Sequence, residues 1–179
     1  MIKDDLSQTD SMGISLIEVL ITISMVTILL GVAFWGYRER SMELVLKHSA
    51  LELVANLEQT REMAMSARMV TGGTERPAGG YGIRFEKDSQ NYIIFIDNNT
   101  DKDYDAGEEI QALSLKQGIS IKLLSPLDPN DVVDVVFIPP SPDVYINGSD
   151  TDSAEITIGD LSRTEKIIVN PAGLILIEN

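Results

Sequence analysis

The densest group of potential metal ligands in the sequence lies in residues 97–108, which read DNNTDKDYDAGE. Oxygen-bearing side chains occupy positions 1, 3, 5, 7, 9 and 12 of this segment, the ligand positions of an EF-hand calcium loop. They belong to Asp97, Asn99, Asp101, Asp103, Asp105 and Glu108. Position 6 is Lys102 instead of glycine, so the spacing predicts a calcium-binding hairpin loop and no true EF-hand. The alternative is a solvated acidic turn, because Asp, Asn and Gly are common in exposed turns.

The composition excludes several other kinds of chemistry. The 179 residues include one histidine, His48, and no cysteine. Thiolate zinc sites, cysteine nucleophiles and multi-histidine metal sites are therefore excluded, and a Ser-His-Asp triad has one candidate base. We predict that the protein is not an enzyme and that it requires no cofactor, with calcium as the candidate ion. The net charge of −14 argues against nucleic acid as a partner, because duplex binding depends on basic contacts to phosphates.

A long apolar run near the N-terminus contains a second candidate site. Residues 14–37 carry one charge, Glu18, and residues 19–37 are all uncharged. As a helix these 24 residues span roughly 36 Å, which is enough to cross a bilayer. The alternatives are a buried core helix and a secretory signal, but a signal has a shorter apolar region followed by small residues. We predict a transmembrane helix, in which a carboxylate is costly and therefore functional unless it reaches water at the membrane edge.

The basic residues that flank the run give a first indication of its orientation. Lys3 precedes the run, whereas Arg38, Arg40 and Lys47 follow it. Basic residues favour the cytoplasmic side, so their count alone would place the residues after the run in the cytoplasm.

The rest of the chain predicts an α+β fold. Residues 38–72 are expected to continue the helix, because apolar residues recur three and four positions apart and Thr71-Gly72-Gly73 supplies a stop. The predicted buried face consists of Leu46, Ala50, Leu53, Leu57, Ala64 and Ala67, with Val54 and Met63 beside it. Nine short strands separated by turns are predicted within 79–179: 81–85, 92–96, 110–115, 119–124, 132–138, 144–146, 155–158, 166–169 and 174–177. Tight turns between short strands predict an antiparallel sheet wrapped around the helix.

The junction between the polar N-terminus and the apolar run resembles a known processing site. The segment GISLIEVL, from Gly13 to Leu20, is similar to the cleavage and methylation site of type IV pilins and pseudopilins, with Ile14 in place of the commoner phenylalanine. The segments LELVANLEQTREMAMSAR, YGIRFEKDSQNYIIFIDNN and TEKIIVNPAGLI also resemble the GspH/FimT branch of minor pilins.

The resemblance implies a structural protein with the pilin fold. A prepilin peptidase would remove the leader, residues 1–13, by cutting after Gly13, and Ile14 would become the N-methylated terminus. Glu18 would neutralise the terminal amine of a neighbouring subunit during filament assembly. The implied partners are the peptidase, other pilins or pseudopilins, an inner-membrane assembly platform and membrane lipid.

The resemblance also implies a single-pass membrane protein with a cytoplasmic N-terminus and an extracytoplasmic C-terminal domain, found in a filament after assembly. This orientation is opposite to the one that the basic residues favour, and we follow the motif because the peptidase must reach Gly13 from the cytoplasm. The alternative function is a membrane-anchored binding module that does not polymerise and whose acidic β domain contacts a ligand.

Overall fold

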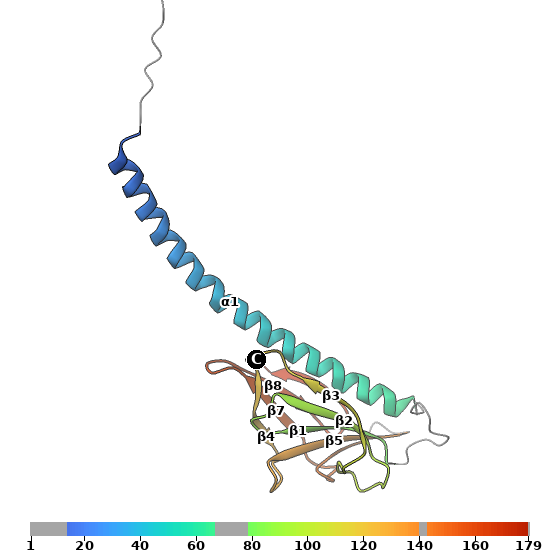
Figure 1. Cartoon of the computed structure of the whole chain (residues 1–179). Helices are drawn as coiled ribbons and strands as arrows, with labels where there is room; N and C mark the ends of the chain where they lie inside the picture. The colour runs from blue at the N-terminus through green and yellow to red at the C-terminus, as the bar shows by residue number, and fades with distance from the viewer. Residues whose placement is uncertain (1–13, 67–78, 140–142, 179) are drawn as a thin grey trace, which may run out of the picture. The chain divides into compact units, whose positions relative to one another are not determined.

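The computed structural model describes residues 14–66, 79–139 and 143–178, without the side chains of residues 34–40. These residues form one helix and nine strands (Figure 1): α1 (Leu16–Met65), β1 (Tyr81–Glu86), β2 (Asn91–Ile96), β3 (Glu109–Ser114), β4 (Ser120–Ser125), β5 (Val132–Ile138), β6 (Asp143–Ile146), β7 (Ala154–Gly159), β8 (Thr164–Val169) and β9 (Ile175–Glu178). The chain divides into two compact units, Met1–Ser41 and Met42–Asn179. The α+β class predicted from the sequence is confirmed.

The first unit contains the apolar part of α1. Residues Leu16–Ala33 have a mean hydropathy of 2.4, and none of their side chains is buried within the structure. Within the described residues this is the one helix that is long and apolar enough to cross a membrane. An apolar helix near the N-terminus is compatible with a membrane anchor or with a signal sequence.

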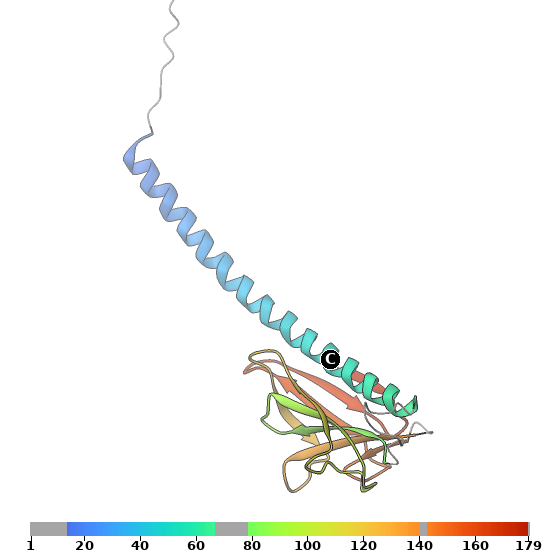
Figure 2. The same cartoon turned by 45° about the vertical axis from the view of Figure 1, so that its right-hand side comes forward.

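The second unit contains the amphipathic part of α1, which lies along the β-strands (Figure 2). The predicted face of the helix is buried at Leu46, Ala50, Leu53, Leu57 and Ala64, and Val54 and Met63 pack beside it. Spacings of three and four residues place these side chains on one side of the helix, which explains the agreement. The helix ends at Met65, and the predicted Ala67 and the stop at residues 71–73 lie outside the described residues.

All nine predicted strands are present, and every pair is antiparallel. They form two sheets instead of the single wrapped sheet that we expected. The five-stranded sheet has the order β3-β2-β1-β5-β6, and the four-stranded sheet has the order β4-β7-β8-β9. The division arises because β5 pairs with β1, about 50 residues earlier in the chain, and leaves β4 to pair with β7.

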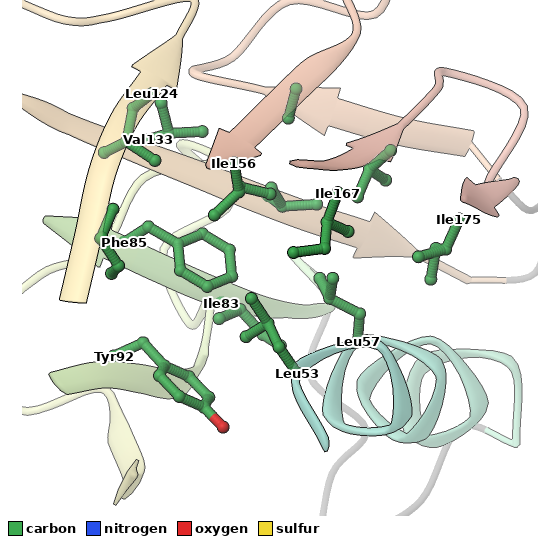
Figure 3. Close-up of a cluster of buried hydrophobic side chains, with 14 of the residues drawn as sticks. Leu53, Leu57, Ile83, Phe85, Tyr92, Leu124, Val133, Ile156, Ile167 and Ile175 are labelled. Atoms are coloured by element: carbon green, nitrogen blue, oxygen red, sulfur yellow. The ribbon is translucent and has the colours of Figure 1, made fainter. Parts of the chain in front are cut away.

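The core lies where α1 meets both sheets. Figure 3 shows Leu53 and Leu57 of the helix pointing toward Ile83 and Phe85 on the five-stranded sheet and toward Ile167 on the four-stranded sheet. Each of these five side chains is fully buried. Burial of a large apolar side chain stabilises the fold by about 1.5–3 kcal/mol, so this three-way contact holds the elements of the second unit together.

The opposite face of the five-stranded sheet is also covered. Phe95 and Val136 on this face are fully buried although they lie outside the main core cluster. The cover is the connection between β2 and β3, residues 97–108, which we call the acidic loop. Its Tyr104 ring meets Phe95 edge-on at 5.5 Å, and Lys102 Nζ lies 3.8 Å from the centre of the Tyr145 ring on β6. The acidic loop therefore packs on the sheet instead of projecting into solvent.

Candidate functional site

The first candidate site surrounds the start of α1. Ile14 and Ser15 precede the helix, the Ile14 side chain is exposed, and Glu18 lies in the first turn. Gly13 and the leader lie outside the described residues, so the structure describes Ile14 and Glu18 of the three predicted site residues. An acidic side chain in the first turn of a helix is favourable because the helix dipole is positive at that end.

The position of Glu18 after the start of the helix also suits a local role that the sequence interpretation did not consider. The Ser15 carbonyl accepts hydrogen bonds from the backbone amides of Glu18, at 3.0 Å, and Val19, at 3.2 Å. Ser15 therefore stands at the N-cap and Glu18 three residues later, the spacing of a capping box. In such a box the acidic side chain satisfies the N-cap amide. The same carboxylate could thus stabilise the helix start within one chain or neutralise an amine of another chain.

The second candidate site is the acidic loop, whose first and last acidic residues are buried and bind backbone amides. The two carboxylate oxygens of Asp97 accept hydrogen bonds from the amides of Thr100, at 2.6 Å, and Lys102, at 3.0 Å. Those of Glu108 accept from the amides of Asn98, at 2.8 Å, and Asp105, at 3.0 Å. Both side chains are less than one-tenth exposed. Burial raises the pKa of Asp97, although the two amides oppose this effect.

Three other predicted ligands come together at the outer surface of the loop. The Asn99 side-chain amide donates to Asp101 Oδ2 and to Asp105 Oδ2, at 2.8 Å each. Asp101 Oδ1 accepts from the amide of Asp103, at 3.0 Å. The Asn99 amide group thus separates two carboxylates that would otherwise repel each other.

The predicted ligands are not arranged as a coordination sphere. In the described part of the chain, no group of three or more acidic or histidine side chains is placed to hold a metal ion. Asp97 and Glu108 point at loop amides. The pKa of Asp103, which is exposed, is raised by partial desolvation and by the neighbouring Asp101. Calcium binding at this loop stays a prediction.

Sequence interpretation missed the residues that fasten the acidic loop to the sheet. Asp134 on β5 is 3% exposed, and its Oδ2 accepts from Arg84 Nη1, at 3.1 Å, and from the Tyr104 amide, at 3.2 Å. Arg84 Nη1 also donates to the Tyr104 carbonyl at 3.2 Å. The available signal was one aspartate inside the apolar strand VVDVVFI, since a buried acid needs a partner. We call Arg84, Asp134 and Tyr104 the loop clasp.

The lone histidine lies in an ordinary surface position on α1. His48 Nδ1 is 3.7 Å from Glu52 Oε2, one helical turn away, and both side chains are exposed. The prediction that the protein is not an enzyme is not tested by this geometry and stays a prediction.

No protein-family profile, curated protein or solved structure matches the chain.

Proposed function

We propose that this chain is a structural subunit of a type IV pilin-like or pseudopilin-like filament. The observation that carries the proposal is the combination of a glycine at the boundary of the apolar run with Glu18 in the first turn of an exposed apolar helix. The same helix continues into an amphipathic half that packs on antiparallel sheets. This order of parts suits a subunit that is stored in a membrane and later assembled through its helix.

In this proposal the N-terminal segment has three successive functions. Prepilin peptidase removes residues 1–13, and Ile14 becomes the methylated terminus. The apolar helix holds the processed subunit in the membrane, with the β domain on the extracytoplasmic side. Glu18 then pairs with the new amine of a neighbouring subunit, because a carboxylate in an apolar environment needs a positive partner.

The deciding experiment is mass spectrometry of the N-terminus after coexpression with a prepilin peptidase. We expect a species that begins at methylated Ile14, and Gly13→Leu should block its formation because the peptidase requires the glycine. A dominant species that begins at Met1 would contradict the proposal. It would favour a membrane-anchored binding module, which needs neither cleavage nor methylation.

A further inference from the structure

The short turn after β6 contains the one Asn-Gly pair in the sequence, Asn147-Gly148. Both residues have a positive φ, 47° for Asn147 and 75° for Gly148. The backbone amides of Ile146 and Ser149 donate to each other's carbonyls, at 2.7 and 2.9 Å. This is a two-residue hairpin turn, for which Asn-Gly is a preferred sequence. Gly148 is exposed, so water reaches the junction between the two residues.

The Asn147 side chain continues the pairing of β6 with β5 beyond the end of the strand. The last pair of the ladder joins Ile146 to Val135. Beyond it the Asn147 backbone amide donates to the Asp134 carbonyl at 3.0 Å, and Asn147 Oδ1 accepts from the Asp134 amide at 2.8 Å. Asn147 Nδ2 donates to the Pro126 carbonyl at 3.1 Å. This half-buried side chain thus fastens β5, at the Asp134 of the loop clasp, to the segment that precedes β5.

An asparagine that precedes a glycine can lose its side-chain amide in water. The Gly148 nitrogen attacks Asn147 Cγ, so that a nitrogen–carbon bond forms and the Cγ–Nδ2 bond breaks. Nδ2 leaves as ammonia, together with the Gly148 amide proton. Water then opens the succinimide ring at either carbonyl and leaves aspartate or isoaspartate. Glycine favours the attack because it has no Cβ to hinder the approach of its nitrogen.

We infer that Asn147 is a deamidation site that is protected in the folded chain, reacts when β6 separates from β5, and afterwards no longer fastens the two strands. The two side-chain hydrogen bonds hold Asn147 against Asp134 and Pro126, so the side chain has to release both before it closes a ring with Gly148. β6 is a four-residue edge strand, and such elements open more readily than central strands. The reaction is irreversible, because the new carboxylate has no hydrogen to donate to the Pro126 carbonyl and ammonia is lost. A transient opening of the sheet edge thus becomes a permanent loss of this contact.

Peptide mapping by mass spectrometry of the full chain in detergent tests the protection. Deamidation is followed at mildly alkaline pH, as the mass gained when NH₂ is replaced by OH, with and without guanidinium chloride at a concentration that unfolds the second unit. We expect the reaction at Asn147 to be at least about tenfold slower without denaturant, because only molecules with an open sheet edge react. Gly148→Ala should slow the reaction in denaturant, which assigns it to this pair. Equal rates in the two conditions, or no product at Asn147 in denaturant, would overturn the inference.

A substitution that mimics the product tests the loss of the contact. Asn147→Asp should lower the ratio of folded to unfolded second unit by about tenfold in denaturant titrations, because the Pro126 carbonyl loses its donor. Asn91→Asp is the matched control and should leave that ratio nearly unchanged. Asn91 is exposed, and its Oδ1 accepts from Ser114 Oγ, a hydrogen bond that a carboxylate retains. Equal stability of the two variants would show that the reaction leaves the strands fastened, and it would also overturn the inference.

Discussion

Arg84 and Asp134 lie directly opposite each other on the central strands β1 and β5, with Arg84 Nη1 3.1 Å from Asp134 Oδ2. Together they bind both polar groups of the Tyr104 backbone, the amide through Asp134 and the carbonyl through Arg84. The Tyr104 ring also lies against the guanidinium, 5.2 Å from its central carbon. One ion pair on the sheet thus fixes the middle of the acidic loop.

Breaking this pair should destabilise the second unit. Arg84→Met leaves the buried carboxylate of Asp134 without its positive partner, and removal of one member of a buried pair costs roughly 3 kcal/mol. Urea unfolding of the full chain in detergent measures the loss. Lys122→Met, a half-buried residue of β4, is the control and should change stability by less than about 0.5 kcal/mol. The double variant Arg84→Met, Asp134→Leu should recover most of the loss, and failure to recover it would contradict the ion-pair explanation.

Asp134 should also make stability depend on pH. Burial raises its pKa to about 6 from the ordinary 3.8, despite Arg84, and its Oδ1 is a buried oxygen without a hydrogen-bond partner in the described residues. The folded state therefore keeps a proton that the unfolded state releases. This stabilisation, at most about 3 kcal/mol, is complete below the unfolded pKa and is lost as the pH rises through about 6.

The comparison with Asp134→Asn isolates this effect, because the other carboxyl groups titrate in both proteins. We expect the unfolding free energy of the wild type to fall relative to that of the variant between about pH 4 and pH 7. Parallel curves for the two proteins over this range would show that Asp134 has an ordinary pKa.

Gly82 provides a test of the packing beneath the acidic loop. A Cβ at this position would lie 2.3 Å from Phe95 Cζ, and the Phe95 ring is fully buried. Gly82→Ala should therefore cost about 1–3 kcal/mol through overpacking. Phe95→Leu in the same chain should relieve part of that cost, so the two effects should be non-additive in urea unfolding. Gly31→Ala is the control, since no atom lies within 4 Å of a Cβ there.

Calcium should stabilise the acidic loop without being required to close it. In chelator the loop should stay closed, because backbone amides hold Asp97 and Glu108. Millimolar calcium should then raise the melting temperature of the full chain, since it offsets the repulsion among Asp101, Asp103 and Asp105. Asp101→Ala, Asp103→Ala should lose that gain. Equal melting of the wild type with calcium and with chelator would identify the loop as a solvated acidic turn.

Glu18→Ala separates assembly from processing. The variant should be cleaved and inserted normally, because loss of a charge makes the helix more apolar, but it should not enter filaments. Incorporation is measured in filaments sheared from cells. Thr22→Ala, one turn along the same helix, is the matched control. If Glu18→Gln restores incorporation, the side chain acts through the capping box, in which glutamine is also accepted, and not through its charge.

Local patterns were sufficient to predict the elements of the fold. The helix face around Leu53 and Leu57 follows from three- and four-residue spacing, and strand β5 was predicted with its observed bounds from VVDVVFI. These patterns depend on neighbours in the sequence. The order of the helix and the strands along the sequence also predicts the α+β class, without knowledge of which strands pair.

The division into two sheets and the loop clasp depend on pairings that local patterns do not contain. Arg84 and Asp134 are 50 positions apart, and the sequence pattern around either residue does not predict its pairing with the other. The EF-hand spacing was detected, but its prediction assumed that Asp97 and Glu108 would face a common ion. In the structure, backbone amides of the loop satisfy both carboxylates, because the loop turns tightly enough to bring those amides within hydrogen-bond distance.

The position of β1 between β2 and β5 determines the order in which the five-stranded sheet can form during synthesis. The hairpin of β1 and β2 is complete once residue 96 has emerged, whereas the other edge of β1 stays unpaired until residue 138 follows. A free edge that carries Tyr81, Ile83 and Phe85 is a site for incorrect pairing with other chains. The nascent chain therefore most needs a chaperone while residues 97–138 are emerging from the ribosome.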